Sequence, residues 1–186
     1  MFMYPPRPEK SILPSMISFY EKKKFIGQVK KNGTCSIANV DSTGNVEFRT
    51  RHNELHRAWT PTAEAKDWFG RYPDSYFVFE LLHSKGGGVR DTLYLFDVLK
   101  MEGTDQVGFP LRERLCLLNT LPVSGKISVA RSYHKDLTAL YRGLSDPLDE
   151  GIVLKDPEAV LAECHRDGLN ANWQVKCRRG TKNFGF

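Results

Sequence analysis

The sequence predicts an α+β domain built on antiparallel sheets flanked by helices. Short β-rich segments dominate the chain, and turn residues join several of them closely enough for antiparallel pairing. Segments with a helical spacing of apolar residues separate the strands. With 186 residues, of which 40% are hydrophobic and 26% charged, the chain is long enough to bury a core and belongs to the globular class.

Turn and cap residues define the expected elements in order. Asn32-Gly33 divides the first β-rich segment, Asp41–Asn45 precedes the next, and Ser84–Gly88 joins two further strands as a hairpin loop. Thr60-Pro61 is a typical helix start. The expected strands lie within Phe25–Val40 (two strands), Val46–Arg49, Tyr76–Leu82, Thr92–Leu99, Gly151–Lys155 and Trp173–Cys177. The expected helices are Thr62–Gly70, Leu111–Leu118 and Leu137–Leu144.

Composition excludes some classes of protein. No apolar run reaches the 18 or more residues of a membrane helix, and the first ten residues hold three prolines and no apolar signal core. The cysteines are scattered, with no CxxC pair and no metal-binding spacing. We therefore expect no membrane partner. We expect the cysteines to be reduced thiols and the protein to lie in the cytoplasm of a bacterial or virus-infected cell.

Positive charge gathers in two places. The net charge is +5, and the segment from Asn172 to the C-terminus carries Lys176, Arg178, Arg179 and Lys182 without a carboxylate. Lys22–Lys24 form a second cluster before the first long β-rich segment. Such runs are usually solvated faces, but here they flank candidate active-site strands, which favours contact with phosphate.

The stretch Lys30-Lys31-Asn32-Gly33 is the most informative. A lysine that ends a strand before a polar residue and a glycine places an amine at the mouth of a pocket. A neutral lysine amine can attack the α-phosphorus of ATP and form a phosphoramidate. Taken alone, this pattern also arises in ordinary hairpins.

Three other segments carry charge inside apolar strands. Glu80 lies within Phe77–Leu82, either paired or coordinating, or facing water on an edge strand. Glu150 opens a strand that Lys155 closes, and period-two alternation predicts that these two lie on opposite faces. The same alternation predicts that Lys176 and Arg178 share one face, an arrangement that suits a triphosphate.

Taken in order, these segments resemble the motifs of ATP-dependent DNA and RNA ligases, relatives of the mRNA capping enzymes, along nearly the whole chain. Lys30–Gly33 is similar to the nucleotidyl-lysine motif Lys-x-Asp-Gly, with Asn32 in place of aspartate. The resemblance extends to Arg51, Glu80, Phe96 in Phe96-Asp97-Val98-Leu99, Glu150 in Glu150-Gly151-Ile152-Val153-Leu154-Lys155, and Lys176 with Arg178.

This resemblance implies roles for these residues. Lys30 is the AMP-accepting nucleophile, and Lys176 and Arg178 supply charge at the α-phosphate. Arg51 contacts ribose and nucleic-acid phosphate, Phe96 stacks on adenine unless it is only a core residue, and Gln28 reads the adenine edge. Glu80 and Glu150 hold metal or ribose, so the implied cofactors are ATP and Mg²⁺.

The resemblance also implies a fold and a function. Residues 1–186 are expected to form one nucleotidyltransferase (ATP-grasp-like) ligase domain of the minimal phage or bacterial kind. The expected function is sealing 5′-phosphate to 3′-hydroxyl ends through lysyl-AMP in DNA repair or replication, with nucleic acid as the partner. The stretch Phe96–Leu118 favours DNA over RNA. An RNA ligase, an RNA-capping-type guanylyltransferase and a catalytically reduced binding module stay open as alternatives.

Two departures from the family pattern bear on the substrate. The chain ends eight residues after Arg178, so no OB-fold domain is expected to follow. A trans-acting protein would replace it, or the basic tail Arg178–Lys182 would substitute for it in part. Thr34-Cys35-Ser36 supplies no arginine where DNA ligases commonly have one after the glycine.

Overall fold

The computed structural model describes residues 2–83, 88–123, 125–161, 166, 168 and 170–180. Over these residues the chain forms two mostly antiparallel sheets with helices beside them, which confirms the expected α+β class. The chain divides into two compact units. Unit 1 comprises the described residues within Met1–Pro6, Gly33–Ala130 and Glu158–Leu169, and unit 2 those within Arg7–Asn32, Arg131–Pro157 and Asn170–Phe186. That residues 1–186 form one ligase domain stays a prediction.

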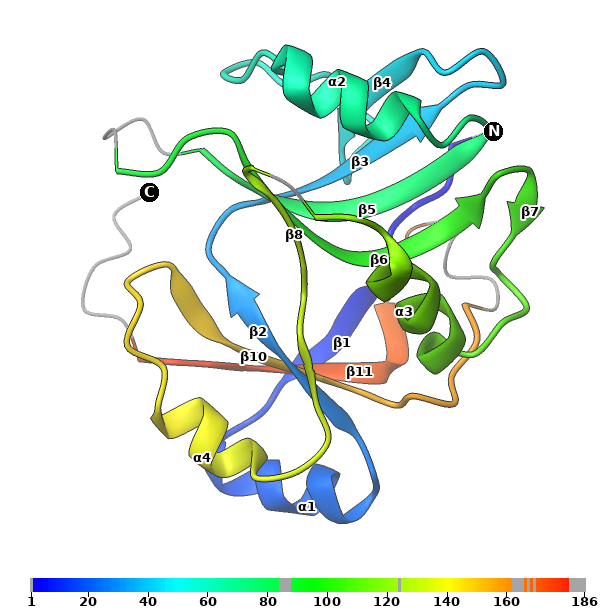
Figure 1. Cartoon of the computed structure of the whole chain (residues 1–186). Helices are drawn as coiled ribbons and strands as arrows, with labels where there is room; N and C mark the ends of the chain where they lie inside the picture. Colours follow the sequence, from blue (N-terminus) through cyan, green and yellow to red (C-terminus); the bar gives the residue numbers. More distant parts are fainter. Residues whose placement is uncertain are drawn as a thin grey trace. The chain divides into compact units, whose positions relative to one another are not determined.

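Unit 1 is built on a sheet with the strand order β4-β3-β5-β6-β7, in which β8 also pairs with β6 (Figure 1). Antiparallel pairing joins the strands of the main path, and β8 runs parallel to β6. The strands are β3 (Thr34–Val40), β4 (Val46–Thr50), β5 (Ser75–Leu82), β6 (Thr92–Met101), β7 (Thr104–Asp105) and β8 (Ile127–Val129).

Helix α2 (Ala63–Gly70) covers one face of this sheet. It begins where the Thr62 hydroxyl accepts a hydrogen bond from the backbone N–H of Ala65 at 3.1 Å, as the Thr60-Pro61 signal predicts. Its apolar side buries Trp68 and Phe69, and Phe69 meets Phe48 from β4 at a ring-centroid distance of 5.5 Å. Packing of large aromatic rings therefore holds α2 on the sheet.

Helix α3 (Leu111–Thr120) packs beside β6 and buries a charged residue along with its leucines. Arg114 and Asp97 are both fully buried, and the guanidinium of Arg114 donates to the two carboxylate oxygens of Asp97 at 2.8 and 3.2 Å. Arg114 also donates to the carbonyl oxygen of Phe109 at 2.8 Å. This buried ion pair fixes the helix to the strand next to Phe96.

Unit 2 is built on a second sheet, with the strand order β1-β11-β10-β2-β9 (Figure 1). The central strands pair antiparallel, whereas β1 runs parallel to β11. The strands are β1 (Arg7–Ser11), β2 (Ile26–Lys31), β9 (Ser132–Tyr133), β10 (Asp149–Lys155) and β11 (Asn170–Arg178).

The core of unit 2 lies between one face of this sheet and two short helices, α1 (Ile17–Lys22) and α4 (Leu137–Arg142). A 3₁₀ turn (Pro14–Met16) leads into α1, and the two helices lie next to each other (Figure 1). The cluster of buried side chains joins the helices to the two central strands and consists of Ile17, Leu137, Ile152, Leu154, Val175 and Cys177. The opposite face of the sheet therefore carries the alternate residues of these strands.

The expected strands and helices are confirmed, with ends that differ by a few residues. Strand β1 was not predicted, because its prolines and charges hide the strand pattern, nor were α1 and the short strands β7, β8 and β9. Of the expected loop Ser84–Gly88 only Gly88 is described, and Lys182 of the basic tail lies outside the described residues. None of the described helices has the length and hydropathy that crossing a lipid bilayer requires.

Candidate active site

Lys30 lies one residue before the end of β2, in the interior of the unit 2 sheet. Its ammonium group donates a hydrogen bond to the carboxylate of Glu150 on the neighbouring strand β10. The Lys30 side chain is 20% exposed and that of Glu150 is 7% exposed. The carboxylate is therefore shielded from solvent, whereas the lysine is accessible. A ligand can therefore reach the amine.

A β-bulge in β10 brings Glu150 to Lys30. Lys31 pairs with Asp149 and Lys30 with Gly151, so Glu150 is an extra residue in the ladder. The bulge interrupts the period-two alternation on which the sequence-based face assignment rested. The prediction that Glu150 and Lys155 lie on opposite faces of the sheet was therefore wrong. The Glu150 carboxylate contacts Lys30, and Lys30 and Lys155 are on the same face.

Gly151 is required for this bulge. Its φ is +150°, and a Cβ added there would lie 2.0 Å from the carbonyl oxygen of Cys177 on β11. Any side chain would therefore push β10 away from β11. The close approach of β10 and β11 therefore explains why a glycine follows Glu150.

Arg178 completes the cluster from the other side of β10. Its Nε donates to the second carboxylate oxygen of Glu150 at 2.6 Å, and the backbone N–H of Arg179 donates to the Glu150 carbonyl at 2.8 Å. One carboxylate thus accepts hydrogen bonds from both Lys30 and Arg178. The Arg178 side chain is 52% exposed, so it can turn toward a ligand without unpacking the core.

The strand register arranges the candidate residues of unit 2 in rows. Gly151 lies between Lys30 and Arg178, and Val153 lies between Gln28 and Lys176. Successive rows are about 7 Å apart, the rise of two strand residues. The prediction that Lys176 and Arg178 share a face agrees with this register, since Val175 and Cys177 point into the helix-side core.

The face is therefore rich in cations and amides. A third row contains Lys155 and Gln174, which are 4% and 2% exposed. Gln28, also buried, donates through Nε2 to the hydroxyl of Ser132 at 3.3 Å. Clustered lysine and arginine side chains suit a phosphorylated ligand, and the carboxylate of Glu150 partly offsets their charge.

Lys31, the next residue along β2, has a different environment. It donates to Asp149 at 2.6 Å and to Asp146 at 3.2 Å. Burial by itself lowers the pKa of Lys31, but its hydrogen bonds to the two aspartates outweigh burial, so the pKa lies above its usual value. Two carboxylates thus hold Lys31 as a cation, and a protonated amine is a poor nucleophile.

Glu80 belongs to unit 1, in strand β5, which lies between β3 and β6. The alternative of an edge strand was therefore wrong. The Glu80 carboxylate accepts a hydrogen bond from the backbone N–H of Gly33 at 3.0 Å. A Cβ added to Gly33 would lie 2.4 Å from the carbonyl oxygen of Leu81, so the glycine of the lysine motif is needed where the chain passes β5.

Phe96 lies at a second bulge, in β6 of unit 1. Val78 pairs with Asp97 and Phe79 with Leu95, so Phe96 is the extra residue. Leu95 and Asp97 are fully buried, but Phe96 is only partly buried. This partial exposure goes against the alternative that Phe96 is an ordinary core residue.

Arg51 also belongs to unit 1 and lies in the turn after β4. Its side chain is exposed, and its Nε donates to Nε2 of His52 at 3.1 Å. Its backbone N–H donates to the carbonyl of Cys35 at 3.0 Å, which holds the turn against β3. Cys35 is opposite Glu80 across β3 and β5.

The sequence-based candidates therefore fall into two groups. Unit 2 brings together Lys30, Glu150 and Arg178 by direct contacts, with Gln28 and Lys176 on the next row of the same face. Arg51, Glu80 and Phe96 belong to unit 1. Among the described residues, no group of three or more His, Cys, Asp or Glu side chains is arranged to hold a metal ion.

Some functional-site features escaped the sequence analysis. The pairing of Lys31 with Asp149 joins residues more than a hundred positions apart, and no local pattern marks it. The Asp97–Arg114 ion pair, in contrast, could have been predicted. Each of its two charged residues lies inside an apolar segment of the stretch Phe96–Leu118.

Comparison with known proteins gives similarity in structure but not in sequence. No family model matches the chain, and no curated protein matches its sequence. Among solved structures, mycobacterial DNA ligase D complexed with ATP and MES superposes with a TM-score of 0.72 and 18% identity, over 95% of this chain and 60% of that one. The ligase domain of M. tuberculosis LigD gives 0.72 and 17%, over 95% and 59%.

An archaeal ATP-dependent RNA ligase is also similar, with a TM-score of 0.60 and 16% identity over 94% of this chain and 48% of that one. This chain therefore spans about 60% of the length of the first two structures and about half that of the third. At these identities the comparison shows a shared fold.

Proposed function

We propose that this chain, which has the fold of the nucleotidyltransferase domains of ATP-dependent DNA and RNA ligases, is an ATP-dependent polynucleotide ligase that carries adenylate on Lys30. The observation that carries the proposal is the contact of one buried carboxylate, Glu150, with both Lys30 and Arg178 on a cation-rich face. A DNA substrate is our first choice. An RNA substrate is the second, because similar folds occur in both classes of ligase.

In the first step, the Lys30 amine attacks the α-phosphorus of ATP. A nitrogen–phosphorus bond forms, the bond from the α-phosphorus to the bridging oxygen breaks, and pyrophosphate leaves with the electron pair. Lys30 must lose a proton to attack, and the Glu150 carboxylate is the acceptor within hydrogen-bond reach of its amine. Glu150 therefore orients the nucleophile and takes up its proton.

Arg178 and Lys176 offset the charge of the phosphates. Both are on the face that carries Lys30, and the half-exposed guanidinium of Arg178 can exchange Glu150 for a phosphate oxygen. Gln28 is on the row next to Lys30 and presents an amide for the base edge. Positioning and charge compensation account for most of the catalysis in such phosphoryl chemistry.

The residues of unit 1 complete the proposal. The partial exposure of Phe96 supports its assignment to stacking on adenine. The Glu80 carboxylate is an acceptor of the kind that suits a ribose hydroxyl or a metal, and the exposed Arg51 suits a nucleic-acid phosphate. These roles follow the resemblance to ligases residue by residue.

Magnesium fits this set of donors. Mg²⁺ at nucleotide sites takes one or two carboxylates and completes its shell with phosphate oxygens and water, so it needs no cluster of three acids. Glu150, beside Lys30 in unit 2, is a carboxylate that would hold it, and Glu80 of unit 1 is a further candidate ligand. Bound there, the ion would neutralise charge on the triphosphate and its leaving group.

In the later steps AMP passes from Lys30 to a nucleic-acid 5′-phosphate, and a 3′-hydroxyl then displaces AMP to seal the strand. Because the contacts are made mainly to phosphates, binding should be independent of sequence and weaken with salt. A trans-acting protein partner would add contacts to the duplex.

The test is incubation with Mg²⁺ and ATP labelled at the α-phosphate, followed by a chase with nicked DNA or nicked RNA duplexes. We expect covalent label on the wild type, none on Lys30→Ala, and near-normal labelling of the matched control Arg112→Ala on the exposed side of α3. Loss of label into one duplex identifies the substrate. Label from GTP alone would indicate a capping-type guanylyltransferase, and ATP binding without an adduct would indicate a reduced binding module; either result contradicts the proposal.

A further inference from the structure

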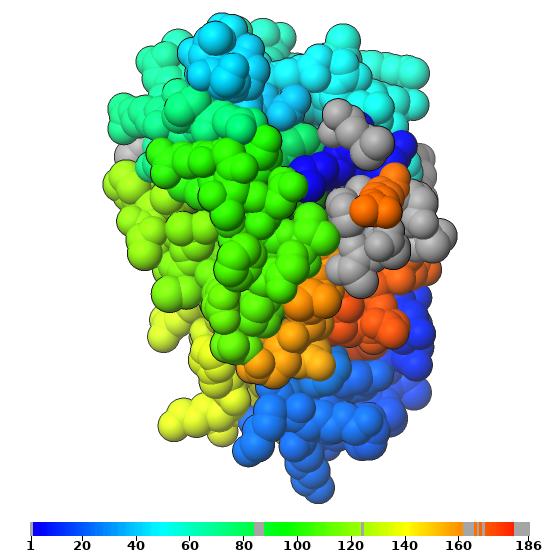
Figure 2. All heavy atoms as spheres, turned by 90° about the vertical axis from the view of Figure 1, so that its right-hand side faces the viewer, coloured from blue at the N-terminus to red at the C-terminus, as the bar shows by residue number. Residues whose placement is uncertain are grey.

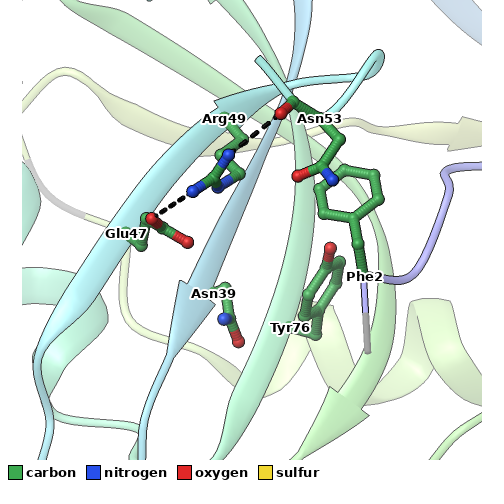
Figure 3. A pocket seen from close by; sticks show the side chains of 6 residues that line it. All are labelled: Phe2, Asn39, Glu47, Arg49, Asn53 and Tyr76. Atoms are coloured by element: carbon green, nitrogen blue, oxygen red, sulfur yellow. Dashed lines mark hydrogen bonds and ion pairs between the residues drawn. The ribbon is translucent and has the colours of Figure 1, made fainter. Parts of the chain in front are cut away.

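A second candidate binding site lies in unit 1, at the far end of the sheet face that carries Glu80. It is an open hollow of about 250 Å³. Figure 3 shows its walls: Glu47 and Arg49 from β4 on one side, Phe2 and Tyr76 on the other, and Asn39 from β3 between them. Asn53 closes one end. None of these residues has a role in the proposed adenylate chemistry.

Strand register shows that the hollow and Glu80 share one face of the sheet. Tyr76 and Glu80 are four residues apart in β5, an even spacing that puts both side chains on the same side. Asn39 is opposite Tyr76, and Glu47 is opposite Asn39. The distance from Tyr76 to Glu80 along the strand is about 13 Å, the rise of four residues.

The aromatic wall is held in place. The hydroxyl of Tyr76 accepts a hydrogen bond from the backbone N–H of Met3 at 3.0 Å. The ring of Phe2 meets that of Tyr76 edge-on at 6.0 Å and that of Tyr4 edge-on at 4.9 Å. Tyr76 is buried, whereas Phe2 is partly exposed. Figure 2 shows the first residues of the chain, in the darkest blue, at the surface next to cyan and green residues of unit 1.

The polar wall is fixed as well, and its charge is balanced. The Arg49 guanidinium donates to the Glu47 carboxylate at 2.6 Å and to the Asn53 carbonyl at 2.9 Å. The hydrogen bond from Arg49 holds the pKa of Glu47 below its usual value, so the pair is ionised at neutral pH. A plain anion gains little here, because the acid already offsets the arginine.

These features define the chemistry of a fitting ligand. A flat ring can lie between a guanidinium plane and an aromatic ring, both of which stack on π systems. The exposed amide of Asn39 both donates and accepts hydrogen bonds, which matches the edge of a nucleobase. The volume suits one ring system and excludes a paired base step. A neutral, planar group with polar edges therefore fits better than an anion or an aliphatic chain.

We propose that this hollow binds one unpaired nucleobase of a nucleic-acid strand, with its ring against Phe2 and its edge at Asn39. The inference rests on the proposed function only in that a strand is the protein's substrate. It adds a base-binding contact on unit 1 that would tell a frayed, gapped or single-stranded end from a fully paired one. Stacking on an aromatic side chain is tolerant of sequence, so the contact would not select one base strongly.

The experiment measures binding of a fluorescently labelled, 5′-phosphorylated single-stranded oligonucleotide by anisotropy. A series of oligonucleotides carries one abasic site, moved through successive positions. We expect wild-type affinity to fall about tenfold when one particular position is abasic, the size of a single stacking contact. Phe2→Ala and Asn39→Ala should weaken binding of the intact strand and abolish the difference at that position.

Matched controls are Phe109→Ala and Asn119→Ala, an exposed phenylalanine and an exposed asparagine of unit 1 outside the hollow. Both should keep the abasic difference. If the Phe2 and Asn39 variants weaken intact and abasic strands equally, the proposal is wrong. It is also wrong if they abolish binding of free AMP but leave strand binding unchanged, since the ligand is then a mononucleotide.

Labelling with ATP, measured on the same variants, separates this proposal from the proposed function. The hollow variants should label normally at Lys30. A wild type that takes no label but keeps the abasic difference would refute the ligase function and support the hollow. A wild type that labels but shows no abasic difference would support the ligase function and refute the proposal for the hollow.

Discussion

The buried ion pair between Asp97 and Arg114 makes the sharpest prediction about stability. Both side chains are fully buried, and two hydrogen bonds join them at 2.8 and 3.2 Å. Arg114→Met removes the cation and leaves the Asp97 carboxylate buried without its partner. Breaking such a pair from one side costs about 3–5 kcal/mol, a large part of the 5–15 kcal/mol that stabilises a typical domain.

This loss should appear as a large fall in the melting temperature. For a chain of this length, each kcal/mol lowers the midpoint by about 2–4 °C, so we expect a drop of about 6–20 °C. Tryptophan fluorescence in a urea titration is a suitable assay, because Trp59 and Trp68 are both buried in unit 1. Trp59 donates to Asp91, just before β6, and Trp68 donates to the Pro122 carbonyl, just after α3. The titration should show the same loss as a lower midpoint.

A double variant provides the control. Asp97→Asn together with Arg114→Met leaves no unpaired charge, and the asparagine carbonyl can still accept the hydrogen bond from the Val98 backbone N–H. We expect the double variant to be more stable than Arg114→Met alone. A single variant that costs less than about 1 kcal/mol, or losses that simply add, would refute the reasoning.

Three further predictions concern the bulge, the site and a partly buried histidine. Gly151→Ala should cost at least about 1–3 kcal/mol in urea unfolding and abolish labelling by ATP, because its Cβ would lie 2.0 Å from the Cys177 oxygen; normal stability would contradict the assigned strain. Arg178→Ala should change stability by less than about 1 kcal/mol, since the side chain is 52% exposed, but slow labelling at least tenfold; equal labelling rates would remove its assigned role. Burial lowers the pKa of His56, so stability present above its unfolded pKa of about 6.5 is lost as the pH falls toward its folded pKa. His56→Gln should therefore lose less stability than the wild type between about pH 7 and about pH 5, with the exposed His52→Gln as control; identical pH profiles for all three proteins would count against this cause.

Local patterns predicted most of the fold. Asn32-Gly33 and Asp41–Asn45 mark turns because few residues allow the chain to reverse there, and the Thr62 cap marks the start of α2. Strand β1 was missed because it pairs with β11, more than 160 positions later, and its own residues carry no strand pattern. Pairing over such distances is set by the whole sheet and not by the segment itself.

Sequence patterns named the candidate residues, whose roles stay predictions, but they could not show the contacts among them. The charged residues inside apolar strands drew attention to Glu80, Glu150 and Lys176. The reach of Glu150 to Lys30 depends on one extra residue in the β10 ladder, which alternation cannot show. The exposure of Phe96 likewise depends on a bulge in β6. In both places a bulge breaks the regular alternation at a candidate residue.

The central claim is that Lys30, and not its neighbour Lys31, accepts adenylate. The most direct measurement is peptide mapping by mass spectrometry after incubation with ATP and Mg²⁺. We predict one adenylyl group on Lys30, none on Lys31, whose amine is held by Asp149 and Asp146, and a normal adduct in Lys31→Ala. An adduct on Lys31, or no adduct in a protein that binds ATP, would contradict the account.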